Sequence, residues 1–551
     1  MCGIWALFGS EDDVSSQCNA VHKITHRGPD AFRIENINHF RNCCLGFHRL
    51  AIVDDIKGMQ PMRLYTYPHL YLIYNGEIYN HELLEKDFDL NTSTTCDGEP
   101  IIHLYAKLGA EMAASQLDGV FAFCILDTAN RKVILGRDTF GVRPMFKLYD
   151  EATGFLAVCS EAKGLFGLSH SLNDAKASIE PLLPGHVEVY DLDQDGKARF
   201  MERKRFHKIG DLPKYRTLAP PVGDEVLANI RNLFEAAVKK RLMSERRIGC
   251  LLSGGLDSSL VTALLVKDAK EQKLPYPIQT FAIGMEGSPD LQAAKTVANY
   301  LGTDHHEVVF TPEEGVRAIE DVIYHLESYD ITTIRASVGM YLISQYISKK
   351  TDTVVILSGE GSDELAQGYI YFHKAPSSEE GDRESRRLLE DLYMYDVLRG
   401  DRTTSAAGLE IRVPFLDHLF TSYYLSIAPE QRKPIKGIEK YLLRSAFSDT
   451  GLLPNDILWR PKEAFSDGVS SKTKSWFSVI QDHCDQQVNE DELEQAATLY
   501  PFNTPKTKEA YYYRKIFESR FPNKSKWIPY FWMPKWCETS DPSARTLKHY
   551  K

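Results

Sequence analysis

The chain has 551 residues, 43% of them hydrophobic and 26% charged, as expected for a globular protein of two to four domains. Its 65 basic and 76 acidic side chains give a net charge of −11, which argues against a nucleic-acid partner. Ten scattered cysteines without a C-x-x-C pair predict neither a disulfide framework nor a structural zinc site, and they favour a reducing compartment.

The first part of the chain, to about residue 205, consists of short β-type segments separated by turns. It opens with MCGIWALFGS, but acidic residues at 11–13 end the apolar run too early for a secretory signal. Segments 69–80, 119–138 and 154–166 are rich in β-branched and aromatic residues, and DTANRK inside the second predicts a hairpin turn. A helix is predicted over 97–109, ending at a glycine. We therefore expect a sheet-rich α+β domain with both sheet faces covered.

The pattern changes after a Pro- and Gly-rich stretch at 208–224, which predicts a linker. Apolar strands then alternate with amphipathic helices, which indicates a parallel α/β sheet. The helices are predicted at 225–243 and 258–273, and the strands at 247–252, 277–285 and 352–359. The last fifty residues are rich in aromatic side chains, which we expect to pack against the body of the protein. No apolar stretch approaches the ~20 residues that a membrane helix requires.

Cys2 is the first candidate catalytic residue. Removal of Met1 would place a free α-amine beside its thiol. An α-amine has a pKa near ~8, so it can act as a base close to neutral pH, and one residue would then supply both nucleophile and base.

A glycine-rich loop follows the predicted strand at 247–252 and precedes a helix. In SGGLDSS (253–259) the two glycines allow close backbone approach, and the helix presents unpaired N–H groups to an anion. The loop is neither a Walker A motif nor G-x-G-x-x-G, and Asp257 would repel phosphates unless a divalent cation bridged them. This string resembles the pyrophosphate-binding loop of ATP pyrophosphatases, which split ATP between the α and β phosphates.

A second loop, SGEGSDEL (358–365), follows the strand at 352–359. Because parallel strands end at the same edge of a sheet, Asp257 and Asp363 are expected to share Mg²⁺. Taken alone, Asp363 is equally explained as a helix cap. Arg335 and Lys462 are candidate phosphate contacts, although lone basic residues are more often surface cations. The isolated histidines lie at no metal-ligand spacing with cysteine, so none is assigned a metal.

Several strings in the first part of the chain resemble class II glutamine amidotransferases of the N-terminal-nucleophile type. They are HRGPD (26–30), HRLAIVD (48–54), YNGEIYN (74–80), CDGE (96–99), LDGVFAF (117–123), GRDTFGVRP (136–144) and LPGH (183–186). The resemblance implies that Cys2 attacks the glutamine amide while Asn75 and the Gly76 N–H form the oxyanion hole. It also implies a glutamine-binding set: Arg49, Leu50, Ala51, Ile52, Val53, Asn75, Gly76, Glu77 and Asp97.

From end to end the chain resembles the glutamine-hydrolysing asparagine synthetases of eukaryotic type. The resemblance implies an N-terminal αββα sandwich in 2–207, a linker in 208–224 and an ATP pyrophosphatase-type α/β domain in 225–551. It implies synthesis of asparagine from aspartate, ATP and glutamine-derived ammonia through a β-aspartyl-AMP intermediate, with Glu360 contacting that intermediate. An internal passage for ammonia, a cytosolic location and a homodimer are further family expectations. The implied ATP-binding set is Leu251, Ser253, Gly254, Gly255, Asp257, Ser258, Ser259, Ile283, Ser358 and Gly359.

Three other classes of protein are disfavoured by specific features. Another class II amidotransferase would lack SGGLDSS, and a nucleic-acid-modifying ATP pyrophosphatase would be expected to show a basic surface. A non-catalytic relative would have lost Cys2, Asp257 or Asp363, and all three are present.

Overall fold

The computed structural model describes residues 1–168, 178–215, 225–462, 468–471, 475–539 and 541–542. The chain divides into two compact units. The first consists of Met1–Leu218, Met243–Arg246 and Gly408–Glu410, and the second of Ala219–Leu242, Arg247–Ala407 and Ile411–Lys551. The sequence carries no signal for the two short segments that return to the first unit.

The first unit contains two antiparallel six-stranded sheets. One has the order β10 (Ile179–Pro181), β8 (Phe146–Asp150), β9 (Phe155–Cys159), β1 (Gly3–Phe8), β3 (Cys43–Arg49) and β2 (Ala31–Asn36). The other has the order β12 (Ala198–Arg205), β11 (His186–Leu192), β7 (Lys132–Arg137), β6 (Gly119–Asp127), β5 (Tyr67–Ile78) and β4 (Met62–Leu64).

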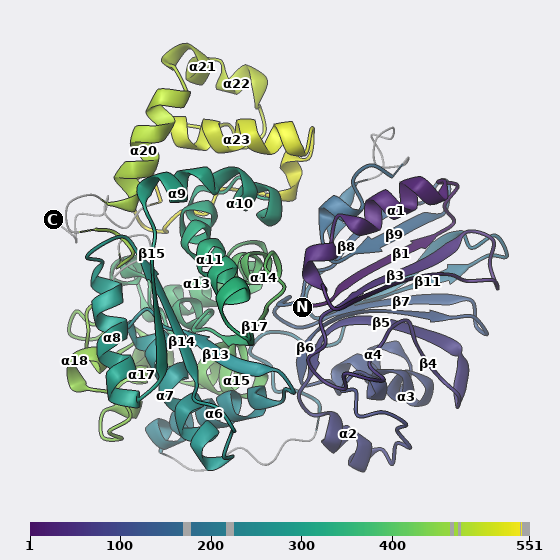
Figure 1. Cartoon of the computed structure of the whole chain (residues 1–551), viewed down its shortest axis with the longest axis horizontal. Helices are drawn as coiled ribbons and strands as arrows, with labels where there is room; N and C mark the ends of the chain where they lie inside the picture. The colour runs from purple at the N-terminus through teal and green to yellow at the C-terminus, as the bar shows by residue number, and fades with distance from the viewer. Residues whose placement is uncertain (169–177, 216–224, 463–467, 472–474, 540, 543–551) are drawn as a thin grey trace. The chain divides into compact units, whose positions relative to one another are not determined.

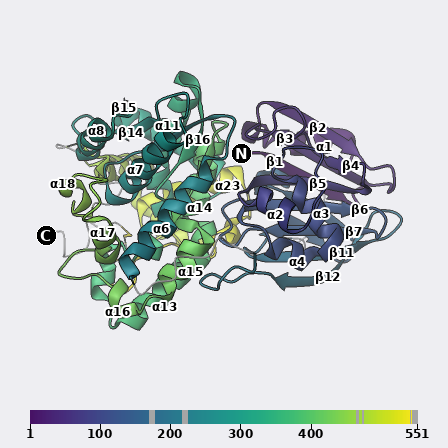
Figure 2. The ribbon, with the colours of Figure 1, turned by 90° about the horizontal axis from the view of Figure 1, so that it is seen from below.

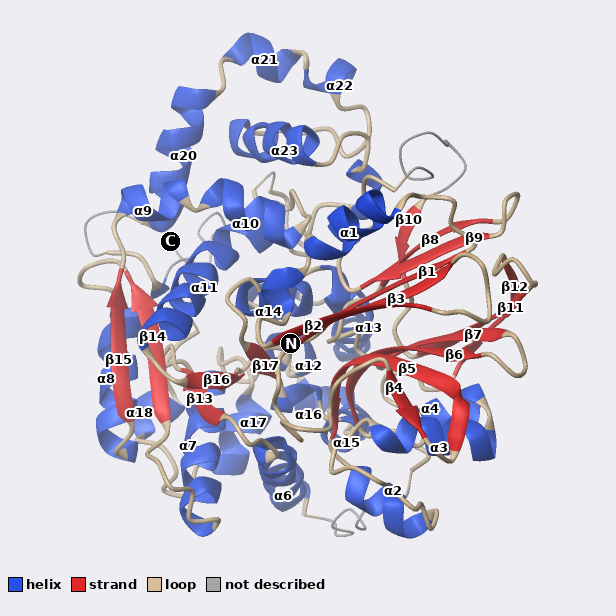
Figure 3. Cartoon of the chain, turned by 45° about the vertical axis from the view of Figure 1, so that its right-hand side comes forward, coloured by secondary structure: helices blue, strands red, loops and turns tan. Residues whose placement is uncertain are grey.

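These sheets pack face to face and are covered outside by helices (Figures 1 and 3). Residues of β1, β3 and β9 share one buried cluster with residues of β5, β6 and β7. A second cluster lies between the other face of β5–β7 and the helices α2 (His81–Asp87), α3 (Glu99–Leu108) and α4 (Ala110–Ser115). Helix α1 (Val14–His22) covers the first sheet, where Val21 reaches Gly46 of β3. The unit is thus the expected αββα sandwich.

The second unit is built around a five-stranded sheet of order β15 (Asp304–Val309), β14 (Gln279–Gly284), β13 (Arg247–Leu251), β16 (Thr353–Leu357) and β17 (Glu410–Arg412). The pairs β13–β14, β13–β16 and β14–β15 are parallel. The chain proceeds from β13 through β14 to β15 on one side, then crosses to β16 on the other. This reversal creates a crevice at the carboxyl ends of β13 and β16, where open α/β sheets bind ligands.

Helices surround this sheet and extend beyond it (Figure 1). They are α6 (Val226–Lys239), α7 (Leu256–Glu271), α8 (Pro289–Leu301), α9 (Pro312–Arg317), α10 (Ile319–Leu326), α11 (Ile331–Lys350), α12 (Ser362–Leu365), α13 (Ser378–Asp391), α14 (Asp396–Ser405), α15 (His418–Ser426), α16 (Pro429–Arg432), α17 (Tyr441–Phe447), α18 (Asn455–Leu458), α20 (Trp476–Gln487), α21 (Glu490–Glu494), α22 (Ala496–Leu499) and α23 (Lys508–Arg520). Among the described residues, no helix is both long and apolar enough to cross a bilayer.

Most predicted elements are confirmed, with shifted ends. The hairpin in 119–138 is β6 and β7 joined by a turn, and the helix predicted over 97–109 is α3. The segment 154–166 is a strand only as far as Cys159, because a 3₁₀ turn begins at Ala162. Residues 216–224 of the predicted linker lie outside the described residues.

The aromatic residues near the carboxyl terminus pack as expected. Trp532 is buried in a cluster with Tyr371, Phe372, Leu388 and Tyr395. The ring of Trp532 also contacts that of Tyr369; the two rings are tilted relative to each other, with centroids 5.4 Å apart.

Candidate functional site

Cys2 lies immediately before β1, facing the end of β3. Gly3 pairs with His48, so the Cys2 thiol lies beside Leu50, whose N–H is 3.4 Å and whose carbonyl oxygen is 3.5 Å from Sγ. Burial raises the pKa of this thiol to about 11. Met1 is present and buried, so the Cys2 nitrogen is an amide here and cannot serve as a base. Loss of Met1 would therefore supply the missing base, because it frees the Cys2 α-amine beside the thiol.

Asn75, on β5, has the features of an oxyanion-hole donor. Its side chain is fully buried, and neither amide atom has a hydrogen-bond partner among the described residues. A buried amide without a partner is costly. A substrate oxygen that accepts a hydrogen bond from this amide would remove that cost. Gly76 follows at φ +149°, and a Cβ there would lie 2.0 Å from the Val120 carbonyl oxygen. The position therefore requires glycine, because the backbone of β6 packs directly against it.

Asp97 is tied to the same strand. Its carboxylate accepts a hydrogen bond of 2.9 Å from the Tyr74 hydroxyl and one of 2.7 Å from the Ile78 N–H. Burial raises the pKa of Asp97 above its ordinary value. Glu77 lies between Tyr74 and Ile78 on β5. Its negative charge adds to the effect of burial in raising the pKa of Cys2, so Glu77 lies near the thiol. The predicted residues Asn75, Gly76, Glu77 and Asp97 are therefore gathered around one end of β5.

Arg49 shapes the loop that follows β3. Its guanidinium donates to the carbonyl oxygens of Asp54 and of Asp55, the latter at 2.6 Å. The Ala51 N–H donates to Asp30 at 2.8 Å, and the Ile52 carbonyl oxygen accepts from the Glu245 N–H at 2.9 Å. Leu50 lies against the Cys2 thiol, whereas Val53 is half-buried in the same loop. The predicted segment 49–53 is thus one fixed loop beside Cys2.

The second site is a cavity of about 310 Å³ at the crevice between β13 and β16. Most of the residues predicted for ATP binding line it. They are Leu251, Ser253, Gly255, Asp257, Ser258, Ile283, Ser358 and Gly359. Glu360, Asp363, Arg335 and Lys462 line it as well. Residues from both glycine-rich loops therefore face one space.

Two predicted ATP-binding residues do not line the cavity. Gly254 has φ +73°, and a Cβ there would lie 2.5 Å from the backbone of Ala293 on α8, so this glycine allows close packing. Ser259 is fully buried within the first turn of α7. Both residues are part of the loop, but neither is among the residues that line the cavity, so their predicted contact with ATP stays a prediction.

Asp257 and Asp363 meet at one ammonium group. Lys440 Nζ lies 2.6 Å from Asp257 Oδ2, 2.6 Å from Asp363 Oδ1 and 3.1 Å from the Ser362 hydroxyl. Lys462 pairs with the other oxygen of Asp363 at 2.6 Å. Burial alone would raise the pKa of Asp363, but the two ammonium groups outweigh it and hold that pKa below its ordinary value.

These residues also fit Mg²⁺. Two carboxylates and a hydroxyl converge on a point that a cation, the Lys440 ammonium, already occupies. Oxygen donors beside a space for phosphates are the usual Mg²⁺ environment in proteins.

Glu360 faces the same cavity and pairs with Arg399 of α14 at 2.8 Å. Burial raises its pKa to about 7, because it outweighs Arg399 and because the charges of Asp396 and Asp363 act in the same direction. A carboxyl group with this pKa exchanges protons at neutral pH, as a general base requires.

Arg335 lines the cavity, but its donors are directed elsewhere. Its guanidinium pairs with Glu509 at 2.5 Å and with Asp541 at 2.8 Å. These carboxylates raise its pKa even though burial opposes the charge. In this structure Arg335 ties α11 to α23 and to residue 541, so the predicted phosphate contact is not supported by its geometry.

Comparison with known proteins gives matches along the whole chain. Residues 1–189 match the family model described as a glutamine amidotransferase domain, and residues 229–387 and 376–540 match the model described as asparagine synthase. The chain is 62% identical to a glutamine-hydrolyzing asparagine synthetase of Gallus gallus over 558 residues, covering 100% of this chain and 99% of that protein. Proteins of the same name from Mus musculus and Homo sapiens are each 60% identical with the same coverage. The chain belongs to the asparagine synthetase family.

Two contacts of this asparagine synthetase family member were missed by sequence reasoning. Lys440 and Arg399 each lie more than thirty residues from the cavity carboxylates Asp363 and Glu360 with which they pair, in stretches without a motif. No sequence signal could have selected them from the 65 basic residues of the chain.

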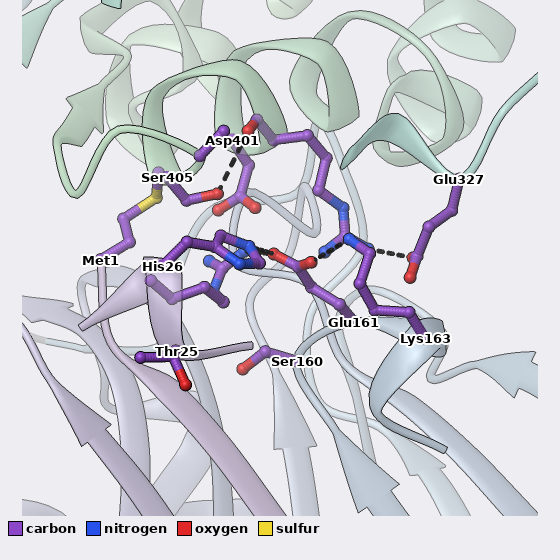
Figure 4. Close-up of polar contacts among 12 residues, drawn as sticks. Met1, Thr25, His26, Ser160, Glu161, Lys163, Glu327, Asp401 and Ser405 are labelled. Atoms are coloured by element: carbon purple, nitrogen blue, oxygen red, sulfur yellow. Dashed lines mark hydrogen bonds and ion pairs between the residues drawn. The ribbon is translucent and has the colours of Figure 1, made fainter. Parts of the chain in front are cut away.

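A buried polar network behind Cys2 was also missed (Figure 4). Arg27 donates from Nε to the Cys2 carbonyl oxygen at 3.0 Å and from Nη1 to Glu161 at 2.7 Å. His26 lies 3.0 Å from the same carboxylate, and Lys163 pairs with its other oxygen. Arg27 belongs to the HRGPD string, so its motif was visible although its role was not. The network holds the backbone of the nucleophile in place.

Proposed function

We propose that this protein synthesises L-asparagine from L-aspartate and ATP, using ammonia that it releases from L-glutamine. The observation that carries the proposal is that one chain holds both a Cys2-centred site with an unpartnered amide donor and a cavity lined by SGGLDSS and SGEGSDEL residues. The 60–62% identity to named glutamine-hydrolyzing asparagine synthetases over the whole chain supports the same reaction.

Glutamine hydrolysis begins at Cys2 once Met1 has been removed. The α-amine takes the thiol proton, and sulfur attacks the glutamine carboxamide carbon. The oxygen that becomes negative is stabilised by the Asn75 side-chain amide and the Gly76 N–H. The same amine returns the proton to the departing nitrogen, so that ammonia leaves, and water then hydrolyses the γ-glutamyl thioester to glutamate. Arg49 and Asp97 bind the carboxylate and the ammonium group of glutamine, with Leu50–Val53 and Glu77 completing the pocket.

Asparagine forms in the cavity between β13 and β16. The side-chain carboxylate of aspartate attacks the α-phosphorus of ATP, which forms β-aspartyl-AMP and releases pyrophosphate. Leu251, Ile283, Ser358 and Gly359 contact the nucleotide, and the loop of Ser253, Gly255 and Ser258 receives its phosphates. Lys462 then moves from Asp363 toward a phosphate oxygen. Ammonia attacks the activated carbonyl, Glu360 accepts a proton from the nitrogen, and AMP leaves.

Asp257 and Asp363 would hold Mg²⁺ in this site, with the Ser362 hydroxyl close by. When bound, the metal neutralises charge on the phosphates of ATP. We also propose a glutaminase domain at 2–207, a linker at 208–224 and a synthetase domain at 225–551. A cytosolic location is supported by ten cysteines that are all free thiols. A homodimer is the family expectation, and light scattering of the purified chain tests it.

The decisive experiment incubates the purified protein with glutamine, aspartate, MgCl₂ and ATP and quantifies the products. We expect asparagine, glutamate, AMP and pyrophosphate in equal amounts when glutaminase and synthetase turnover are coupled. Formation of ADP in place of AMP, or nucleotide cleavage that does not depend on aspartate, would show that the proposal is wrong.

A further inference from the structure

Three carboxylates gather where α6 packs on α7, outside the cavity. Glu235 of α6 and Asp268 and Glu271 of α7 each bring one oxygen to within 4.8 Å of the others. The two helices lie side by side in the second unit (Figures 1 and 2). Asp268 follows Asp257 by eleven residues on α7, which is about 16 Å along the helix axis. None of the three lines the cavity, so the cluster is a separate feature.

Asp268 is the unusual member. Its side chain is 0% exposed, and neither of its oxygens has a hydrogen-bond partner among the described residues. A buried carboxylate without a partner is among the most expensive groups a fold can contain. Burial and the nearby charge of Glu235 raise its pKa to about 6, although Lys239 opposes them. At neutral pH Asp268 therefore carries a negative charge that no hydrogen bond within the described chain compensates.

The surrounding charges leave the cluster negative. Lys267 forms an ion pair with Glu235, and its charge also acts on Asp268 and Glu271, while Lys239 acts on Asp268 through its charge. Three carboxylates thus face two ammonium groups. Asp268 and Glu271 also occupy the last turn of α7, where the helix ends at Glu271 and its free carbonyl groups favour a positive charge.

We propose that Glu235, Asp268 and Glu271 bind a divalent cation of the Ca²⁺ or Mg²⁺ type, which clamps α6 to α7. All three ligands are oxygens, as these cations require. Three oxygens placed evenly around Ca²⁺ at about 2.3–2.6 Å lie about 4.0–4.5 Å apart, and around Mg²⁺ at about 2.0–2.1 Å they lie about 3.5–3.6 Å apart. Oxygens within 4.8 Å of one another therefore reach Ca²⁺ with side-chain movements of a few tenths of an ångström at most, whereas Mg²⁺ requires the ligands to draw closer together.

The test uses the full-length protein, freed of metal by EDTA and measured without nucleotide at pH 7.5. Binding of CaCl₂ and of MgCl₂ is followed by calorimetry, and the thermal midpoint is recorded in EDTA and in each salt. For the unmodified protein we expect uptake of at least one of the cations and a rise in midpoint. Asp268→Asn should bind that cation at least tenfold more weakly. It should also be more stable than the unmodified protein in EDTA, because it removes a buried unpaired charge.

Two further variants separate this site from other acidic groups. Glu271→Gln changes an exposed ligand, so it should fold normally yet weaken binding. Glu313→Gln removes an exposed carboxylate on α9, outside the cluster, and should leave the response intact. The proposal is overturned if Asp268→Asn binds both cations as the unmodified protein does, or if the unmodified protein binds neither.

Discussion

Replacing Glu360 by Gln should improve stability and greatly slow synthesis in the same protein. The raised pKa means that ionising Glu360 is unfavourable in the folded chain, so stability is highest below pH 4.5 and is lost as the pH rises to about 7. A shift from 4.5 to about 7 corresponds to about 3 kcal/mol. At pH 8 the free energy of unfolding of Glu360→Gln should exceed that of the unmodified protein by up to this amount. The gain is reduced by loss of the ion pair between Arg399 and Glu360, which lies at 2.8 Å. Loss of a general base should slow synthesis by roughly 10²–10⁴.

The assay follows asparagine formation with NH₄Cl as the nitrogen donor and subsaturating aspartate, between pH 6 and pH 9. Free ammonia increases with pH for both proteins, so the ratio of the unmodified rate to the variant rate is the useful quantity. Because a group with a pKa of about 7 ionises across this range, we expect the ratio to rise about tenfold from pH 6 to pH 8. Glutaminase activity serves as the control and should not change. A variant that keeps a tenth of the unmodified rate, or a ratio independent of pH, would refute the assignment of Glu360 as base.

Three other substitutions divide the two activities. Cys2→Ala should eliminate glutamine-dependent synthesis while ammonia-dependent synthesis continues. Loss of both activities together would contradict two separate sites. Protein that retains Met1, identified by intact mass, should likewise use ammonia but not glutamine. Asn75→Ala should lower kcat for glutamine hydrolysis by about 10²–10³ without lowering stability, since no protein partner is lost, and urea unfolding measures the second point. Asp363→Asn should reduce pyrophosphate release by roughly a hundredfold and leave glutaminase activity intact; an unchanged rate would exclude Asp363 as a metal ligand.

The fold could be predicted largely from the period of apolar residues. Alternating segments such as 119–138 and the strand–loop–helix at 247–273 carry strong local signals, and both appear as predicted. Element ends were less accurate, because the 3₁₀ turn at Ala162–Gly164 depends on packing rather than on local composition. Segments 243–246 and 408–410 join the first unit through tertiary contacts alone, which no local pattern encodes.

Motifs located the candidate sites, but not the basic residues that form ion pairs with the carboxylates of those sites. SGGLDSS and SGEGSDEL identify Asp257 and Asp363 because each string is a glycine-rich loop that follows a parallel strand, so its place at the edge of the sheet can be predicted. Lys440 pairs with both carboxylates from a short turn that carries no recognised motif, so its position is visible only in three dimensions. Arg335 shows the opposite case: it is a basic residue near the expected site whose guanidinium the fold pairs with Glu509 and Asp541.

The ion pairs in the cavity indicate how nucleotide and metal binding depend on each other. Lys440 and Lys462 are both engaged by Asp363, and each pair lies at 2.6 Å in a half-buried site. Phosphate oxygens compete for the same ammonium groups, and removing both lysines from Asp363 would leave a half-buried carboxylate without a partner, which is unfavourable. The lysines can therefore turn to phosphate at low cost only if another cation takes the carboxylates. By thermodynamic reciprocity, a metal that strengthens ATP binding is itself bound more tightly when ATP is present. The ion pairs of Asp363 with the two lysines thus disfavour binding of the metal alone or of the nucleotide alone, and they favour binding of the two together.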